Sequence, residues 1–185
     1  LTSSMTIEGW VNANTLLPVQ QGEILFRGDD RGGLDPYSLS LQSNGSLRFE
    51  VSSLSGAASV STPMPLGQFV HVVGTLDDSS GAMRLYLNGV LMSQATTTVR
   101  PFGDLDPASN PGIGIGNHGG YPATPHNFPF NGLIDDLKVY DQALTAAEVL
   151  TDFNAGKGSL QPAISISDAT VTEGEQTVKY LGNIA

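Results

Sequence analysis

The sequence predicts an all-β fold built from short antiparallel strands joined by tight turns. The 185-residue chain has 22 glycines and only three lysines, and its acids are mainly Asp (12) rather than Glu (6). Helical proteins are rich in Glu and Lys, whereas Gly, Asp, Ser and Thr favour turns and strands. Asn-Gly pairs at 44–45 and 88–89 each lie between segments of alternating polarity. That combination is the strongest short signal for a β-hairpin.

The first half of the chain contains a succession of predicted strands. In residues 5–11, Ile7 and Val11 fall on one face of the strand, and Glu8 and Trp10 fall on the other. The strands expected after it are 22–27, 37–42, 46–51, 69–76, 83–87 and 90–93. Because tight turns separate most of these strands, we expect neighbours along the chain to pair in antiparallel hairpins and meanders.

The second half is predicted to hold two more strands, one helix and the start of another domain. Strands are expected at 112–116 and 130–140, and Thr145 with Glu148 forms a capping box for a short C-terminal helix that ends near Gly156. The predicted boundaries are a first domain over 1–155, a linker over 156–163 and truncated first strands of a second domain over 164–185. About twenty residues cannot bury a core of their own.

Charge and composition exclude several classes of protein. The formal net charge is −10, which leaves no basic surface for DNA or RNA and disfavours an anionic membrane. No apolar run approaches the roughly 18 residues of a spanning helix, so membrane insertion is not expected. The chain has no Cys, which excludes disulfides, thiol catalysis and cysteine metal sites.

The sequence carries none of the common hydrolase motifs, and we expect no catalytic residues. It has neither a Gly-x-Ser-x-Gly nor a His-Glu-x-x-His pattern, and no Glu-x-Asp-x-x-Glu spacing that would bring glycosidase carboxylates together on one strand. Asp77 and Asp78 lie in a Ser/Gly turn, where carboxylates cap backbone amides. His71 alternates within an apolar strand and is expected to be a half-buried structural residue.

Asp135 and Asp136 interrupt an apolar strand and form the candidate metal site. Adjacent strand residues face opposite ways, so one of the two is expected to point toward the core or a ligand. Ca²⁺ is the natural partner for carboxylate oxygens held in such a place. The alternative is structural, with one Asp solvated and the other hydrogen-bonded at a strand end.

The order of these segments resembles the bacterial laminin G-like, concanavalin A-like jelly roll over about residues 5–155. The matching segments are 6–11, 24–29, 37–41, 65–75, 85–89, 113–116, 130–140 and 143–148. The resemblance implies an antiparallel two-sheet jelly-roll sandwich, Trp10 in or beside its core, and a secreted or surface module that often binds one Ca²⁺. It places the calcium ligands at Asp29 and Asp135. Residues 164–174 resemble the start of a Calx-beta domain, a repeat of large bacterial surface proteins.

These observations predict a non-catalytic binding or adhesion module of a large, multidomain, extracellular bacterial protein. The expected ligand is a polysaccharide or glycoprotein, bound on a concave sheet face or on the rim formed by residues 117–130. There, Tyr121 and Phe128 would stack on sugar rings, while Asn117 and His118 would supply hydrogen bonds. Three alternatives remain open: a loop that only covers a sheet end, a spacer in a repeat array, and an accessory domain of a polysaccharide-degrading enzyme.

Overall fold

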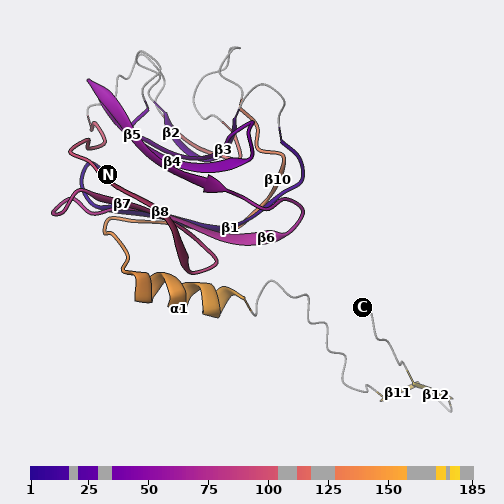
Figure 1. Ribbon diagram of the computed structural model, residues 1–185. Helices are drawn as coiled ribbons and strands as arrows, with labels where there is room; N and C mark the ends of the chain where they lie inside the picture. Colours follow the sequence, from indigo (N-terminus) through magenta and orange to yellow (C-terminus); the bar gives the residue numbers. More distant parts are fainter. Residues whose placement is uncertain are drawn as a thin grey trace.

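Two five-stranded antiparallel sheets pack face to face, which confirms the predicted fold class (Figure 1). The computed structural model describes residues 1–16, 21–28, 35–103, 112–117, 128–157, 170–173 and 176–179. Sheet A has the order β10 (Gly132–Tyr140), β1 (Met5–Ala13), β6 (Phe69–Leu76), β7 (Ala82–Leu87) and β8 (Val90–Thr96). Sheet B has the order β5 (Gly56–Pro63), β4 (Ser46–Ser53), β3 (Tyr37–Leu41), β2 (Gly22–Gly28) and β9 (Gly112–Ile115).

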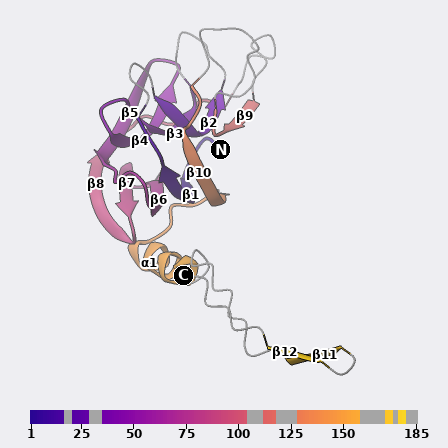
Figure 2. The same cartoon turned by 90° about the vertical axis from the view of Figure 1, so that its right-hand side faces the viewer.

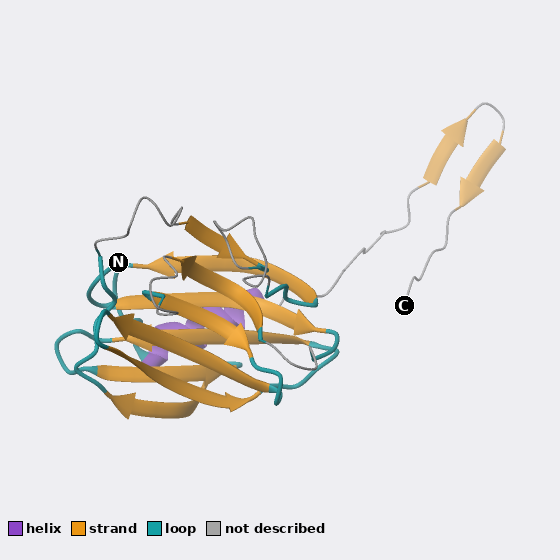
Figure 3. Ribbon diagram, turned by 90° about the horizontal axis from the view of Figure 1, so that it is seen from above, coloured by secondary structure: helices purple, strands orange, loops and turns teal. Residues whose placement is uncertain are grey.

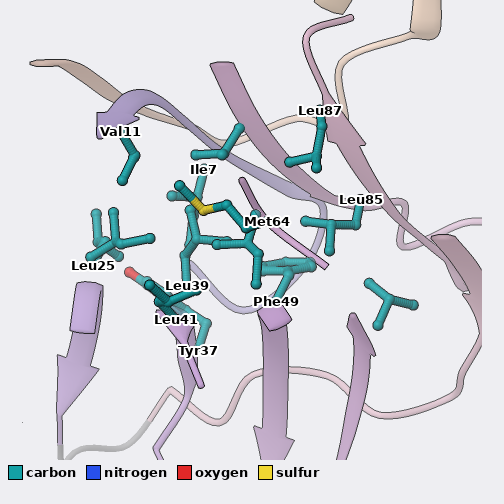
Figure 4. Close-up of a cluster of buried hydrophobic side chains, with 14 of the residues drawn as sticks. Ile7, Val11, Leu25, Tyr37, Leu39, Leu41, Phe49, Met64, Leu85 and Leu87 are labelled. Atoms are coloured by element: carbon teal, nitrogen blue, oxygen red, sulfur yellow. The ribbon is translucent and has the colours of Figure 1, made fainter. Parts of the chain in front are cut away.

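The core lies between the two sheets and uses one side chain in two from each central strand. Leu39 and Phe49 of sheet B and Ile7 and Leu85 of sheet A are all fully buried in one cluster (Figure 4). Burying a side chain of this size stabilises the fold by about 1.5–3 kcal/mol. Gly74 makes room for the Phe49 ring, because a Cβ at that position would lie 2.6 Å from Phe49 Cγ.

Helix α1 (Ala146–Gly156) covers the outer face of sheet A (Figures 1 and 2). The predicted capping box is present: the Glu148 amide donates to Thr145 Oγ1 (3.3 Å), and the Thr145 amide donates to Glu148 Oε2 (2.7 Å). Val149 of the helix is buried against Val73 and Tyr86 of the sheet. Seen from above, sheet B lies in front and α1 lies behind sheet A (Figure 3).

The turns were predicted well. Gly45 and Gly89 have φ values of 84° and 78°, the left-handed conformation that glycine supplies at hairpin turns. Asp77 Oδ1 accepts hydrogen bonds from the amides of Ser79 (2.8 Å) and Ser80 (3.3 Å), so this carboxylate caps its turn as expected.

Strand β5 was not predicted from the sequence. Its eight residues include only two buried side chains, Val60 and Thr62, and the remainder are small or exposed. The strand forms by pairing with β4 from Ser46↔Pro63 to Ser53↔Gly56, so its partner rather than its own hydrophobicity determines it.

The tail residues form a short hairpin of β11 (Thr170–Glu173) and β12 (Gln176–Lys179). Within the described residues these two strands pair only with each other. The expected strand at 164–168 lies outside the described residues. The domain boundaries and the resemblance to a Calx-beta domain stay predictions.

Neither Asp135 nor Asp136 points toward the core, and a direction toward a ligand stays a prediction. Asp136 has a φ of +47° and the register with β1 shifts at this point, so Trp10 pairs with Asp135 while Glu8 pairs with Lys138. This β-bulge adds one residue to the strand. Ile134 and Leu137 therefore both pack on the core, and both carboxylates are exposed.

Candidate functional site

The outward face of sheet B carries a row of polar side chains whose centre is fully buried. Cross-strand pairing places Glu23 beside Ser40 and Ser40 beside Arg48, across β2, β3 and β4. The neighbouring residues Leu39, Leu41, Leu47 and Phe49 face the core, so this row points the opposite way. Glu23 and Ser40 are both 0% exposed. A carboxyl at the centre of a sheet is costly unless it has a partner or a function.

Gln21 connects Glu23 to Arg48. The Gln21 amide donates to Glu23 Oε1 (2.6 Å), and Arg48 Nη2 donates to Gln21 Oε1 (3.4 Å). Arg48 Nη1 lies 3.3 Å from Glu50 Oε2, and both of these side chains are about a quarter exposed. We name this set, Gln21, Glu23, Arg48 and Glu50, the sheet B polar face. Its surface is Gln21, Arg48 and Glu50, and its floor is Glu23.

The floor carboxyl is neutral at physiological pH. Burial raises the pKa of Glu23 to about 8, although the Gln21 hydrogen bond and the Arg48 charge act to lower it. Two buried atoms of the face, Glu23 Oε2 and Arg48 Nε, have no hydrogen-bond partner among the described residues. Buried polar atoms are nearly always paired, so unused hydrogen-bonding capacity marks a place for water or a ligand.

Two of the four residues predicted to bind a ligand lie beside this face. Asn117 Oδ1 accepts a hydrogen bond from the Phe128 amide (2.9 Å), and the Phe128 carbonyl accepts one from the Glu23 amide (2.9 Å). The structure thus brings Asn117 and Phe128 together next to Glu23. The other two, His118 and Tyr121, lie outside the described residues.

The members of the sheet B polar face were not predicted from the sequence. A signal was present, because Arg48 and Glu50 alternate with Leu47, Phe49 and Val51 and therefore share one face of β4. Glu23 is a lone acid in an apolar strand, the same kind of signal that singled out Asp135. What the sequence did not supply is the register that places β2, β3 and β4 side by side.

The predicted calcium ligands are described only at Asp135. Asp135 is exposed, and its Oδ1 accepts a hydrogen bond from the amide of Asp136 (2.9 Å). Among the described residues, no three His, Asp or Glu side chains come together in a way that could hold a metal ion. Asp29, the second predicted ligand, lies outside the described residues, so its role stays a prediction.

A second buried charged cluster lies on sheet A beneath α1. The Lys138 ammonium donates to Glu8 Oε1 (2.9 Å), and His71 Nε2 lies 3.7 Å from the same oxygen. Burial raises the pKa of Glu8, but His71 and Lys138 lower it by more, so the pKa is below its ordinary value. His71 is 1% exposed and thus fully rather than half buried.

Aromatic rings from the sheet and the helix close this second cluster. The Trp10 ring lies 5.1 Å from His71 and 5.7 Å from Phe153 of α1, measured between centroids. Trp10 is buried beside the core rather than in it, as the sequence allowed. Because α1 covers the cluster, it has a structural role, and the sheet B polar face is the better candidate site.

Comparisons with known proteins agree with this architecture. The sequence model of the concanavalin A-like lectin/glucanases superfamily matches residues 1–150. No curated protein matches the chain.

Three solved structures illustrate the likeness. A protein from Bacteroides ovatus, described as a candidate carbohydrate-binding protein, is 22% identical with a TM-score of 0.61, over 81% of this chain and 41% of that one. Domain 4 of an extracellular arabinanase from Geobacillus stearothermophilus, in complex with arabinotriose, is 24% identical with a TM-score of 0.59, over 82% and 66%. A pentraxin from Limulus polyphemus is 20% identical with a TM-score of 0.57, over 81% and 69%. At these identities the likeness shows the fold.

Proposed function

The chain belongs to the concanavalin A-like lectin/glucanases superfamily, and on that premise we infer that it is a non-catalytic carbohydrate-binding module. The single observation that carries this proposal is the sheet B polar face, where the buried atoms Glu23 Oε2 and Arg48 Nε have no partner among the described residues. The two bacterial structures named above, one of them holding arabinotriose, support a sugar as the ligand.

The sheet B polar face suits a ligand rich in hydroxyl groups. Gln21, Arg48 and Glu50 are partly exposed and present both donors and acceptors. Phe128 is half-buried at the edge of this face, where an aromatic ring can pack on the apolar side of a sugar. Asn117 fixes the Phe128 backbone through its side-chain oxygen, which makes it a positioning residue in this proposal.

The geometry favours binding over glycoside cleavage. Cleavage needs two carboxyls about 5–9.5 Å apart that both reach the sugar. Glu23 is entirely buried and cannot reach a sugar as a free carboxylate would, and Glu50 lies on β4, two strands away from β2. Glu50 is also engaged with Arg48. Release of reducing sugar from any polysaccharide incubated with the protein would contradict this part of the proposal.

The wider setting is proposed from the sequence. We place the domain in a multidomain, extracellular bacterial protein that binds a polysaccharide or glycoprotein.

Calcium at Asp29 and Asp135 belongs to the same prediction, and its test is thermal melting with and without EDTA. EDTA should lower the melting temperature, and Asp135→Asn should remove most of that sensitivity; a variant that stays fully sensitive would exclude Asp135 as a ligand. Within the described residues, no helix has the length and hydropathy of a membrane span.

The proposal is tested by binding to a panel of polysaccharides, measured by affinity electrophoresis and calorimetry. Arg48→Ala should weaken binding by roughly tenfold or more, because it removes the central donor of the face. Arg84→Ala is the matched control, since Arg84 lies on β7 of the other sheet and should leave affinity unchanged. Failure of every polysaccharide to bind at millimolar sugar would favour the alternative of a spacer domain.

A further inference from the structure

The sheet B polar face contains more acid than base. Arg48 is its one cation among the described residues and already faces the carboxylate of Glu50, while Glu23 is protonated and Asp35 is close enough to raise its pKa. Several other described cations are engaged elsewhere, with Lys138 on Glu8, Arg100 on Asp78 and Lys157 over the Phe153 ring. A negatively charged ligand would find little compensation on this face.

Two of the three nitrogens of the Arg48 guanidinium already have partners. Its Nη1 faces Glu50 and its Nη2 donates to Gln21, which leaves Nε as the nitrogen without a partner among the described residues. Recognition of a carboxylate by arginine uses two parallel N–H groups. A uronate or sialate that paired with Nη1 and Nη2 would have to displace Glu50 or Gln21, and one that paired with Nε and a neighbouring Nη would have to share the charge of Arg48 with Glu50. The buried Nε offers a single N–H, which suits a hydroxyl or a ring oxygen instead.

The buried floor also favours an uncharged partner. Glu23 accepts from Gln21 through Oε1, and its second oxygen is unpaired among the described residues. When protonated, this carboxyl donates one hydrogen bond and accepts others, as a sugar hydroxyl does. An anion bound above Glu23 would be repelled by the Glu50 carboxylate. It would also raise the pKa of Glu23 further, so Glu23 would stay protonated and would give the anion no electrostatic attraction.

From this geometry we propose that the sheet B polar face selects neutral, hydroxyl-rich glycans and rejects glycans that carry carboxylates. The inference rests on the proposed carbohydrate-binding function and names its class of ligand. The same proposal gives Glu50 a role in selectivity. By occupying Arg48, Glu50 prevents the guanidinium from binding an acidic sugar.

The test uses calorimetry with linear arabinan, xylan and galactan as neutral probes and with polygalacturonate and alginate as acidic probes, at physiological ionic strength. We expect at least one neutral polymer to bind roughly tenfold or more tightly than either acidic one. Glu50→Gln should release Arg48 and bring a gain in binding of an acidic polymer. Asp141→Asn removes the same charge at an exposed position after β10 and should produce no gain.

The outcomes separate the two proposals. Acidic polymers that bind the unaltered protein as tightly as neutral ones would overturn the selectivity and leave the carbohydrate-binding function intact. A Glu50→Gln variant that gains no acidic ligand, while circular dichroism shows it folded, would overturn the role of Glu50. Binding of none of the five polymers would overturn the carbohydrate-binding function and the inference together.

Discussion

Glu8 and Glu23 are fully buried carboxyls on the outward faces of the two sheets, yet their surroundings differ. Glu8 on sheet A accepts from Lys138, lies against His71 and belongs to the sheet on whose outer face α1 packs. Glu23 on sheet B has a neutral amide as its direct partner, with Arg48 one residue further away. The pKa of Glu8 is lowered and that of Glu23 is raised to about 8, so the first is an anion and the second a neutral acid at physiological pH.

The comparison shows that the partners of a buried acid indicate its role better than its burial does. A carboxylate that receives a cation and is closed off by aromatic rings holds the structure together. A carboxyl that burial has neutralised, with only the neutral Gln21 amide as its direct partner, has no such ionic partner. Burial alone would not separate the two residues, because both are at most 1% exposed.

The largest expected effect is a pH dependence of stability caused by Glu23. The folded chain keeps a proton on this carboxyl between its ordinary pKa of 4.5 and its raised pKa of about 8, while the unfolded chain loses it. Stability therefore falls as the pH rises through this window, by up to about 5 kcal/mol. Glu23→Gln should remove this pH dependence. The free energy of unfolding of the variant should equal that of the parent at pH 4.5 and exceed it at pH 8.

Urea denaturation across this range of pH, followed by circular dichroism, measures that effect. For Glu8 the sign is opposite: its lowered pKa stabilises the fold above pH 4.5, and this contribution is lost as the pH falls below that value. If the unfolding free energy of the Glu23→Gln variant fell with pH between 5 and 8 as steeply as that of the parent, the assignment of Glu23 as a neutral acid would be wrong.

The next effect comes from removing the charge of Glu8. Glu8→Gln leaves Lys138 and His71 without their anion and should cost about 2–4 kcal/mol of unfolding free energy at pH 7. Glu50→Gln is the control, because its ion pair with Arg48 is partly exposed and should be worth at most about 1 kcal/mol. Equal losses in the two variants would show that the sheet A cluster is no more structural than the sheet B face.

A smaller effect is expected where α1 closes over the cluster. Gly156 packs directly on Trp10, and a Cβ there would lie 2.4 Å from the indole Nε1. Gly156→Ala should displace the end of the helix and cost about 1–3 kcal/mol. Gly56→Ala is a clean control, since a Cβ at that position meets nothing within 4 Å.

Trp10 is the single tryptophan, so its fluorescence reports the opening of α1 directly. Gly156→Ala should change this emission and leave the pH dependence caused by Glu23 unchanged. An altered pH dependence between pH 5 and 8 would mean that the two regions are coupled through the core.

The smallest expected effect comes from removing the cation beside Glu8, which makes the surroundings of Glu8 more like those of Glu23. Lys138→Met removes the cation from Glu8, and because the Lys138 side chain is 47% exposed the loss should be only about 1 kcal/mol. The pKa of Glu8 should then rise, because burial would no longer be opposed by the ammonium. Carboxyl titration by NMR measures this shift, and an unchanged pKa would show that His71 alone keeps Glu8 charged.

The elements that could be predicted from sequence were those with local signals. The turns at Gly45 and Gly89 and the helix start at Thr145 each follow from a few adjacent residues. Strand β5 could not be predicted, because its stability comes from β4. The core-facing direction expected for Asp135 or Asp136 was wrong, because alternation assumes a regular strand and the bulge at Asp136 breaks it.

The candidate site was predictable only at its edge. Asn117 and Phe128 stood out as side chains suited to sugar binding, and the structure places them beside Glu23. The face itself combines residues from three strands, and its chemistry depends on the burial of Glu23 and on the partners of Arg48. These are properties of strand register, which polar residues on the outside of a sheet do not determine.

The bulge at Asp136 also has a consequence for self-association. Strand β10 is one edge of sheet A, and an additional strand can extend a sheet only along a regular, uncharged edge. The extra residue and the adjacent carboxylates of Asp135 and Asp136 interrupt that edge. The opposite edge, β8, also has a register shift with β7, between Leu85 and Tyr86, but it exposes Val90, Leu91 and Met92 and carries no charged residue. Strand addition to sheet A, and with it aggregation of the domain at high concentration, is therefore directed to β8.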